Sequence, residues 1–469
     1  MEKRFITTPI YYINDAPHLG HAYTSIAADV IARYFRGKDD EIFFLTGTDE
    51  HGAKIAQAAE KAGKEPKVFA DEISGKFKDL TEKLNISSDA FIRTTDPKHE
   101  KYVSDFLQKL YDAKFIYKKS YEGLYCVGCE KFLTEKDLVD GNCPDHKCPP
   151  EIQAEENWFF RLSDFASQIR ALIEKDEIEV RPQSRKNEIL GKIDLGLEDI
   201  SISRKSVEWG IRVPWDETQT VYVWIDALIN YLSATEIFKK EDFWPPHLHL
   251  VGRDIVWFHA VIWPALLLAV EKKLPKKIFV HGYFTVDGQK MSKTIGNVVD
   301  PIELVNKYGV DSVRYYVLRD FPFGEDGDVS IARLEERHNN DLASGLGNLV
   351  QRVLSLIKQN NISMSDIDFT QRKASERINN LTENLKFQEA LIEIWKLIAI
   401  ANKEIAEAEP WKLAKEGKKK ELEEFLHKSF KKVLEITETV SPYLPETAEE
   451  IRIQAKSLDL KPIFKKIQD

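Results

Sequence analysis

Apolar and polar residues alternate in blocks along the first third of the chain, and these blocks predict strands and helices in turn. The apolar stretch from Phe5 to Tyr12 predicts a strand, which a polar turn follows at residues 14–17. A helix is predicted next by apolar residues at four-residue spacing: Ala22, Ile26, Val30 and Tyr34. The apolar run 42–45 then predicts a buried strand of a parallel sheet. This order is typical of a nucleotide-binding sheet, which holds ligands at the carboxyl ends of its strands.

The pattern changes near residue 114. Short aromatic, strand-like pieces at 121–125 and 158–162 surround a cluster of cysteines. The blocks of strands and helices resume near residue 221, and residues 248–252 predict another buried strand. This arrangement indicates an insertion between two halves of one sheet.

The chain that follows predicts a hairpin and then helices. Residues 278–286 and 289–292 are the expected arms of the hairpin, with the tight turn Asp287-Gly288 between them. The pattern becomes helical beyond about Asp341, and helices are expected to end before Pro410 and Pro442. The predicted fold class is therefore α/β, with a Rossmann-type parallel sheet split by an insertion and followed by a C-terminal α-helical bundle.

Composition narrows the class of protein further. The 469 residues are 43% hydrophobic and 31% charged with a net charge of −10, which indicates a soluble globular protein of several domains. The net charge does not exclude a local basic face that binds nucleic acid. Neither an apolar run long enough to span a membrane nor an N-terminal signal peptide is present, so we expect a cytoplasmic protein that does not bind a membrane.

The cysteines have the spacing of a metal site. All four lie between Cys126 and Cys148, which is unlike a secreted disulfide scaffold. Two ligand pairs at knuckle spacing predict a tetrahedral, structural zinc ion with four protein ligands: Cys126, Cys129, Cys143 and His146. Cys148 is the alternative fourth ligand, and free thiols without a metal are the alternative for the whole cluster.

Two short motifs predict a site for a nucleotide. His18 and His21 flank Gly20 at the start of the first predicted helix, where imidazoles and helix N–H groups can hold phosphates. Lys290 and Lys293 lie in a loop after the hairpin and can clamp a triphosphate. Each motif alone also fits an ordinary loop. Together and in this order, they resemble the signature pair of the class I aminoacyl-tRNA synthetases.

The flanking residues resemble one family within that class. The segments TTPIYYINDAPHLGH, TGTDEHG, VWIDALINY, GRDIVWFH and KMSKTIGN are similar to methionyl-tRNA synthetases, and the similarity continues through AEPWKLAKEG to KPIFKKI near the C-terminus. The resemblance implies five divisions, which are the first half of the catalytic domain (1–114), the insertion with a zinc knuckle (115–222), the second half of the catalytic domain (223–284), the connecting region of the KMSK loop (285–345) and the anticodon-binding helices (346–469).

The resemblance implies formation of methionyl-adenylate and pyrophosphate from methionine and Mg²⁺-bound ATP, followed by methionyl transfer to the terminal adenosine of tRNA(Met). It assigns catalysis to His18, His21, Lys290 and Lys293, and it adds Gly20 and Arg253 as ATP-binding residues. Asp49 would bind the substrate ammonium, although capping of the next helix is an alternative. The methionine side chain would contact apolar and aromatic residues: Ile10, Tyr12, Trp224, Ala227, Leu228, Tyr231, Ile255, His259 and Trp263. Without the resemblance, the helical stripes among these residues are ordinary core.

The C-terminal helices would read the anticodon through Asn348, Arg352 and Trp411, by stacking and by hydrogen bonds to base edges. Packing at a helix start is the alternative for Trp411. A separate proofreading activity is not expected, because the insertion is short. We expect a monomer, unless a separate chain supplies a tRNA-binding subunit.

Two other functions remain open from the sequence. One is a class I ligase for a different apolar amino acid, which the TGTDEHG and WFHAVIW segments disfavour. The other is a paralogue that binds RNA and has lost catalysis, which the intact histidine and lysine motifs disfavour.

Overall fold

The structure is a computed structural model that describes residues 1–126, 131–133, 135–144, 147–286, 288–290, 298–364 and 375–467. It contains two compact units, each assembled from separate stretches of chain. The first unit comprises residues 1–17, 41–79 and 88–280, and the second comprises residues 18–40, 80–87 and 281–469.

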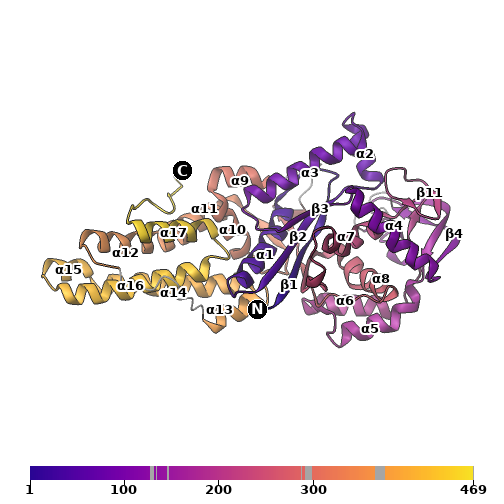
Figure 1. Ribbon diagram of the computed structural model, residues 1–469. Helices are drawn as coiled ribbons and strands as arrows, with labels where there is room; N and C mark the ends of the chain where they lie inside the picture. The colour runs from indigo at the N-terminus through magenta and orange to yellow at the C-terminus, as the bar shows by residue number, and fades with distance from the viewer. Residues whose placement is uncertain are drawn as a thin grey trace. The chain divides into compact units, whose positions relative to one another are not determined.

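A six-stranded sheet forms the centre of the first unit. Its order is β3-β2-β1-β12-β13-β7, and Figure 1 shows β1, β2 and β3 side by side. The bounds are β1 Lys3–Tyr12, β2 Glu41–Asp49, β3 Ala90–Arg93, β7 Glu179–Arg181, β12 Leu248–Gly252 and β13 Lys277–His281. Parallel pairing joins β1 to β2 and β12, β2 to β3, and β13 to β7. The predicted parallel sheet is thus confirmed.

The strand order reverses direction at β1, which creates a topological switch point between β1 and β12. The chain places β2 and β3 on one side of β1, and β12 and β13 on the other. Open parallel sheets bind ligands outside the carboxyl ends of the strands at such a point. Tyr12, Asp49 and Gly252 are the last residues of β1, β2 and β12, so they mark this edge.

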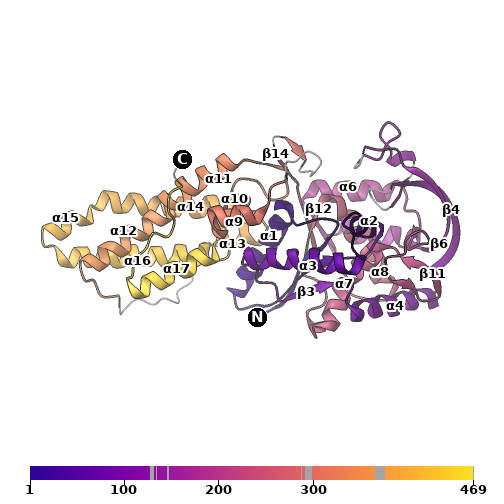
Figure 2. The ribbon, with the colours of Figure 1, turned by 90° about the horizontal axis from the view of Figure 1, so that it is seen from above.

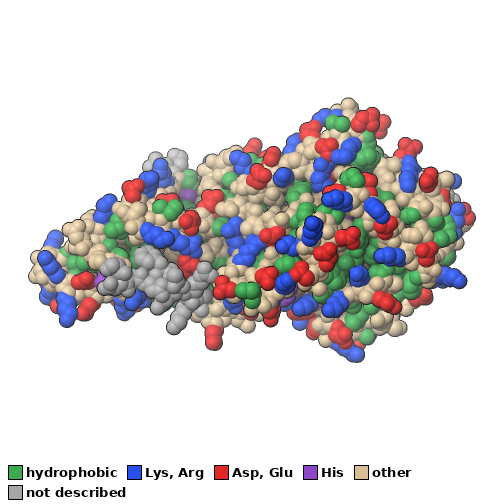
Figure 3. All heavy atoms as spheres, in the orientation of Figure 1, with side chains coloured by type: hydrophobic (Ala, Val, Ile, Leu, Met, Phe, Trp, Pro, Cys, Tyr) green, Lys and Arg blue, Asp and Glu red, His purple; other side chains and the backbone are tan. Residues whose placement is uncertain are grey.

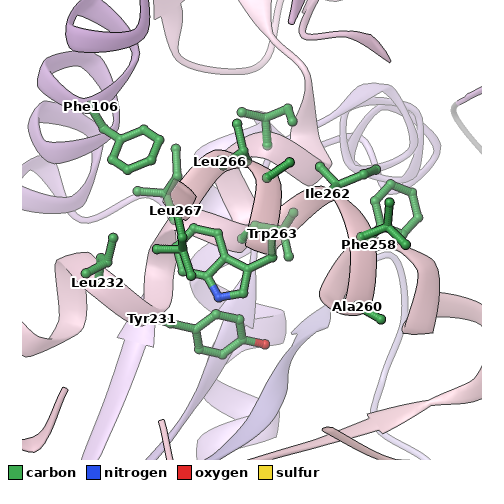
Figure 4. Packing of buried hydrophobic residues seen from close by; sticks show 14 of the residues in the cluster. Phe106, Tyr231, Leu232, Phe258, Ala260, Ile262, Trp263, Leu266 and Leu267 are labelled. Carbon is green, nitrogen blue, oxygen red and sulfur yellow. The ribbon is translucent and has the colours of Figure 1, made fainter. Parts of the chain in front are cut away.

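Helices cover the sheet and complete the core of the first unit. Their bounds are α2 Ala53–Lys61, α3 Pro66–Lys83, α4 Pro97–Asp112, α5 Ala166–Glu174, α6 Gln183–Asp194, α7 Val223–Ile237 and α8 Trp263–Ala269. One extensive cluster of buried apolar side chains includes residues of β1, β2, α4, α7 and α8. Figure 4 shows Tyr231 and Leu232 of α7 packed near Trp263 and Leu267 of α8.

Antiparallel strands form two small sheets in the predicted insertion. A sheet of order β5-β4-β6-β8 contains β4 Ile116–Cys126, β5 Lys131–Leu133, β6 Glu151–Phe160 and β8 Ile200–Ser201. Figure 2 shows its long strands β4 and β6 side by side. A second sheet contains β9 Ser203–Arg204, β10 Arg212–Val213 and β11 Asp216–Val221. The segment 115–222 also contributes β7 to the parallel sheet, so it is not purely an insertion.

The second unit begins with α1 Leu19–Arg36 and contains a small sheet of order β15-β14-β16. Its strands are β14 Phe284–Val286, β15 Gln289–Lys290 and β16 Gly327–Val329. The pairing of β14 with β15 confirms the predicted hairpin. The single strand predicted at 278–286 is wrong, because β13 ends at His281 and β14 pairs instead with β15 and β16.

The rest of the described second unit is helical. The helices are α9 Pro301–Tyr308, α10 Val310–Arg319, α11 Ile331–Arg337, α12 Asn348–Gln359, α13 Glu376–Glu383, α14 Phe387–Ala408, α15 Pro410–Lys415, α16 Lys419–Val440 and α17 Pro445–Ser457. The predicted helix ends before Pro410 and Pro442 are confirmed, since α14 ends at Ala408 and α16 at Val440. Proline lacks the N–H that would continue either helix.

A buried ion pair joins α1 to α10 inside the second unit. Nη2 of Arg314 lies 2.6 Å from Oδ2 of Asp29, and both side chains are fully buried. The same guanidinium donates to the carbonyl oxygens of Leu84, Pro442 and Tyr443. Arg314 therefore connects four separate stretches of the chain.

The surface carries both signs of charge. Figure 3 shows basic and acidic side chains interspersed over the face in view. Within the described part of the chain, we find no helix with the length and apolar character needed to cross a membrane.

Candidate active site

Asp49 lies at the carboxyl edge of the parallel sheet. It is the last residue of β2 and is 4% exposed, and the backbone N–H of Ile13 donates to its carbonyl oxygen at 3.2 Å. The N-cap of the following helix α2 is Gly52 rather than Asp49. The capping alternative is therefore wrong, and the Asp49 carboxylate is placed where the switch point predicts a ligand.

The loop after β2 is held by a buried carboxylate. Glu50 is fully buried and accepts two hydrogen bonds from the Arg93 guanidinium, at 2.7 and 2.8 Å. Burial would lower the pKa of Arg93, but the carboxylate of Glu50 raises it overall. The backbone carbonyl of Glu50 also accepts from Nε1 of Trp209 at 2.7 Å. The Glu50 carboxylate is thus paired with Arg93, and the Glu50 carbonyl is bonded to Trp209. These contacts fix the backbone of the residue that follows Asp49.

Two residues of the predicted methionine pocket form a defined hydrogen-bonded pair. The hydroxyl of Tyr231 lies 2.8 Å from Nε2 of His259, and Nδ1 of His259 lies 3.0 Å from the carbonyl oxygen of Ile255. Burial lowers the pKa of His259 to about 4, so the imidazole is neutral at physiological pH. Since a carbonyl only accepts, Nδ1 carries the hydrogen and Nε2 accepts from Tyr231. The pair is polar but uncharged, so it suits a pocket that binds an uncharged substrate side chain.

The four-residue spacing of Ile255, His259 and Trp263 predicts a regular helix. The structure differs from this prediction. A 3-10 turn (η4, Arg253–Ile255) leads into a π-helix (η5, Phe258–Ile262), and α8 starts only at Trp263. π-Helical turns occur frequently at functional sites. The ring of Phe258 in this segment stacks on Trp224 with centroids 4.2 Å apart, a contact that the sequence did not reveal.

The predicted pocket residues divide into two groups by burial. Five are no more than 5% exposed, namely Ala227, Leu228, Tyr231, His259 and Trp263. Four are partly buried and pack against the same apolar cluster, namely Ile10, Tyr12, Trp224 and Ile255. The first unit thus brings the side chains of β1, α7 and the π-helical segment to one apolar cluster.

Arg253 directly follows β12 and is partly buried in the η4 turn. The turn has Gly252 as its N-cap, and it opens at the carboxyl edge of the sheet. Arg253 therefore lies directly after the carboxyl end of β12, and its contact with a phosphate stays a prediction.

The two histidines of the first motif interact at the start of α1, in the second unit. His18 is the N-cap residue, and its Nδ1 accepts from the backbone N–H of Gly20 at 3.1 Å. Nδ1 of His21 accepts from the backbone N–H of His18 at 3.0 Å, and the two ring centroids are 3.9 Å apart. With Nδ1 accepting in both rings, Nε2 is left as the hydrogen-bond donor of each.

Two further features of this motif are the neutral state of His21 and the absence of a side chain at Gly20. Burial, and then the neighbouring His18, lower the pKa of His21 well below its usual value, so its imidazole is neutral. A Cβ atom on Gly20 would lie 2.9 Å from Cε1 of His18, so a larger residue here would displace the His18 ring. The motif therefore offers two neutral donors to a phosphate.

The second motif is only partly described. Lys290 is the last residue of β15, which pairs with β14, whereas Lys293 lies outside the described residues. The clamp on the triphosphate stays a prediction.

Two of the predicted zinc ligands are buried together. Cys126 and Cys143 are 1% and 0% exposed, and they share a small cluster with Leu133. The backbone N–H of Cys143 donates to the carbonyl of Cys148 at 2.9 Å. Cys148 itself is exposed, and Cys129 and His146 lie outside the described residues. The described residues alone contain no group of three or more candidate metal ligands.

The predicted anticodon residues come from α12 and α15 of the second unit. The guanidinium of Arg352 lies 5.9 Å from the centroid of the Trp411 ring, and Trp411 is 39% exposed. Asn348 is exposed at the start of α12, with its amide nitrogen 3.3 Å from Oδ1 of Asn402. Trp411 is therefore not a fully packed residue at a helix start.

A buried cluster beside Asp49 was missed from the sequence. His51 and His99 both contact Asp226 in α7. His51 and His99 are 175 and 127 residues away from Asp226 along the chain, so local sequence patterns do not link them. The only signal for this cluster in the sequence was a histidine two residues after Asp49.

The sequence model described as "tRNA synthetases class I (M)" matches residues 4–149 and 146–354, which places the chain in class I of the tRNA synthetases. A methionine–tRNA ligase of Caldanaerobacter subterraneus is 46% identical over 95% of this chain and 73% of its own length. One from Thermotoga maritima is 43% identical over 98% and 76%.

A solved structure of Mycobacterium tuberculosis methionyl-tRNA synthetase in complex with methionyl-adenylate is similar in fold. Its TM-score is 0.90 at 38% identity, covering 96% of this chain and 93% of that one. The chain belongs to the methionyl-tRNA synthetase family, as the resemblance predicted.

Proposed function

We propose that this chain ligates L-methionine to tRNA(Met). The methionine carboxylate attacks the α-phosphate of ATP, which forms methionyl-adenylate and releases pyrophosphate, and the 3′-terminal adenosine hydroxyl of the tRNA then takes the methionyl group. The observation that carries the proposal is the apolar wall with the neutral Tyr231–His259 pair, in the same unit as Asp49 at the carboxyl edge of the sheet. Relatives with 43–46% identity carry the same activity in their names.

In this proposal Asp49 binds the substrate ammonium, because a buried carboxylate at a sheet edge attracts a cation. Tyr231 and His259 lie beside the thioether and carry no net charge. An apolar, aromatic surface suits sulfur, which packs well at ring edges. The remaining wall comes from Ile10, Tyr12, Trp224, Ala227, Leu228, Ile255 and Trp263.

His18 and His21 donate hydrogen bonds from Nε2 to the phosphates of ATP. Gly20 lets the phosphates approach the backbone of the helix start. Arg253, Lys290 and Lys293 stabilise the triphosphate and the leaving pyrophosphate. Mg²⁺ would arrive with ATP and neutralise part of its charge. No protein nucleophile is required, since the reaction needs positioning and charge stabilisation.

Zinc fits the residues of the 126–148 segment. Two thiols that are buried in one small cluster suit a metal with thiolate ligands better than isolated cysteines would. We propose Cys126, Cys129, Cys143 and His146 as ligands. The exposure of Cys148 favours His146 as the fourth, because ligands of a structural zinc are enclosed. The ion would hold together a segment with little apolar core of its own.

The C-terminal helices would bind the anticodon. The exposed Trp411 ring near the Arg352 guanidinium offers a stacking surface with a positive charge beside it, which is how unpaired bases are held. Asn348 would add amide hydrogen bonds to base edges.

ATP–pyrophosphate exchange with each of the twenty amino acids tests the proposal directly. We expect exchange with methionine alone, without tRNA. Exchange with another apolar amino acid would refute the pocket assignment, and no exchange with any amino acid would favour an RNA-binding protein without catalysis. Methionylation of tRNA(Met) then tests the second step.

A further inference from the structure

A buried chain of polar side chains links the end of β2 to α4 and α7. Nδ1 of His51 lies 2.8 Å from Oδ2 of Asp226, and Oδ1 of Asp226 lies 2.7 Å from Nε2 of His99. Nδ1 of His99 in turn lies 2.6 Å from Oγ of Ser233. All four residues are at most 4% exposed. Both oxygens of one buried carboxylate are thus held by imidazoles from two other elements.

The chain of contacts lies between the two parts of the proposed methionine site. His51 is two residues beyond Asp49, which would bind the ammonium. Asp226 is in the first turn of α7, which also carries Trp224, Ala227 and Tyr231. The Asp226 carboxylate therefore ties the helix that lines the side-chain pocket to the loop that directly follows Asp49, the ammonium-binding residue at the end of β2.

Opposite charges strengthen the contact between His51 and Asp226. Burial would lower the pKa of His51, but the carboxylates of Asp226 and Glu100 raise it to about 10. Burial would raise the pKa of Asp226, but its bonds to His51 and His99 lower it overall. His51 and Asp226 thus form a buried ion pair at neutral pH, and separating such a pair would leave an uncompensated buried charge.

We propose that His51, Asp226 and His99 are positioning residues that set the separation between the ammonium-binding and side-chain-binding parts of the methionine site. The inference rests on the proposed activation of methionine. The three residues act through Asp49 and α7, without contacting the substrate. If the separation changes, a ligand that occupies both parts loses affinity, whereas a ligand that occupies the side-chain pocket alone does not.

The test uses His51→Gln and Asp226→Asn in the full-length chain. Each keeps a polar side chain of similar shape and removes the ion pair. We expect the KM for methionine in ATP–pyrophosphate exchange to rise about tenfold to hundredfold, as for the loss of a charged hydrogen bond, with the KM for ATP within about twofold of the wild type. Ser233→Ala removes only the neutral hydrogen bond between Ser233 and His99, and it should raise the methionine KM about threefold.

A matched control separates positioning from general destabilisation. Lys186 in α6 is 7% exposed, and its Nζ lies 2.8 Å from Oδ1 of Asp176 and 3.0 Å from the carbonyl of Glu174. Lys186→Met therefore removes a buried positive charge and its contact with the exposed Asp176, elsewhere in the same unit. It should lower the unfolding temperature and leave the methionine KM unchanged.

Two competitive inhibitors supply a readout that a purely structural role would not produce. L-Methioninol carries the amine and the thioether, whereas 4-(methylthio)butan-1-ol lacks the amine. In His51→Gln, the Ki of methioninol should rise by the same factor as the methionine KM, and the Ki of the amine-free alcohol should stay within about twofold.

Three results would overturn the inference. They are equal rises in both Ki values, an unchanged methionine KM in folded His51→Gln and Asp226→Asn, and an unchanged methionine KM in Ser233→Ala. A wild-type chain that exchanges with no amino acid would instead refute the proposed function, so the two failures are distinguishable.

Discussion

Replacing Arg314 by methionine should lower the unfolding temperature of the second unit substantially. Its guanidinium is fully buried and makes four hydrogen bonds, to Oδ2 of Asp29 at 2.6 Å and to the carbonyls of Tyr443, Pro442 and Leu84 at 2.9, 3.1 and 3.2 Å. Methionine retains much of the apolar stem but donates no hydrogen bond. The Asp29 carboxylate and three carbonyl oxygens would lose this donor group.

The size of the loss in stability depends on the partners that Asp29 keeps in Arg314→Met. Removing one partner of a buried ion pair costs about 3–5 kcal/mol. Asp29 keeps Nε of Arg33 at 2.7 Å and the hydroxyl of Ser87 at 2.6 Å, so we expect a cost near the lower end of this range. About 3 kcal/mol corresponds to a fall in Tm of about 6–12 °C for a unit of roughly two hundred residues.

Thermal unfolding at neutral pH, followed by calorimetry, measures this change. Lys403→Met is the control, because Lys403 pairs with Glu407 at 3.6 Å and both side chains are exposed, at 75% and 66%. Such a pair is worth at most about 1 kcal/mol. A fall in Tm for Arg314→Met no larger than for Lys403→Met would refute the reasoning.

Four further predictions concern the sheet, the pocket, the metal and the RNA. Gly47→Ala should abolish methionine exchange and lower the yield of folded protein, because its Cβ would lie 2.1 Å from a carbonyl oxygen of β3. Tyr231→Phe should raise the methionine KM about fivefold through loss of one buried hydrogen bond, as measured by pyrophosphate exchange. Elemental analysis should find one zinc in the wild type and in Cys148→Ser, and none in Cys143→Ser. Trp411→Ala should lower kcat/KM for tRNA(Met) charging about tenfold while exchange stays unchanged, and equal losses in both assays would contradict its anticodon role.

The acid side of the stability profile provides a separate check on Asp29. Burial would raise the pKa of Asp29, but Arg314, Arg33 and Ser87 lower it overall. A group whose pKa is lowered in the folded state stabilises the protein above its ordinary pKa, and this stabilisation is lost as the pH falls. The difference in Tm between the wild type and Asp29→Asn should therefore shrink as the pH falls below about 4.

Local signals predicted some elements closely. The run of apolar residues at 248–252 has the bounds of β12, and both proline-marked helix ends agree with the structure. Each of these features depends on residues close together in the chain. The spacing of His18 and His21 likewise placed them on one side of a helix start, where their rings are 3.9 Å apart.

Features that depend on distant partners were not predictable. β7 joins the parallel sheet only because β13 lies beside it, about a hundred residues later. The break between β13 and β14 arises since each pairs with a different sheet. The π-helix at Phe258–Ile262 looks like an α-helix from its apolar spacing. Within the site, the contact between His51 and Asp226 spans 175 residues, which periodicity does not reveal.

The contact between Asp29 and Arg314 also has a consequence for synthesis on the ribosome. The two residues are 285 positions apart. At about 5–20 residues per second, the carboxylate of Asp29 is made roughly 15–60 s before its guanidinium partner. During that interval Asp29 has only its earlier partners Arg33 and Ser87, and the residues of α10 that contact α1 have not yet been made. The early part of the second unit is therefore the stretch on which we expect a nascent-chain chaperone to act.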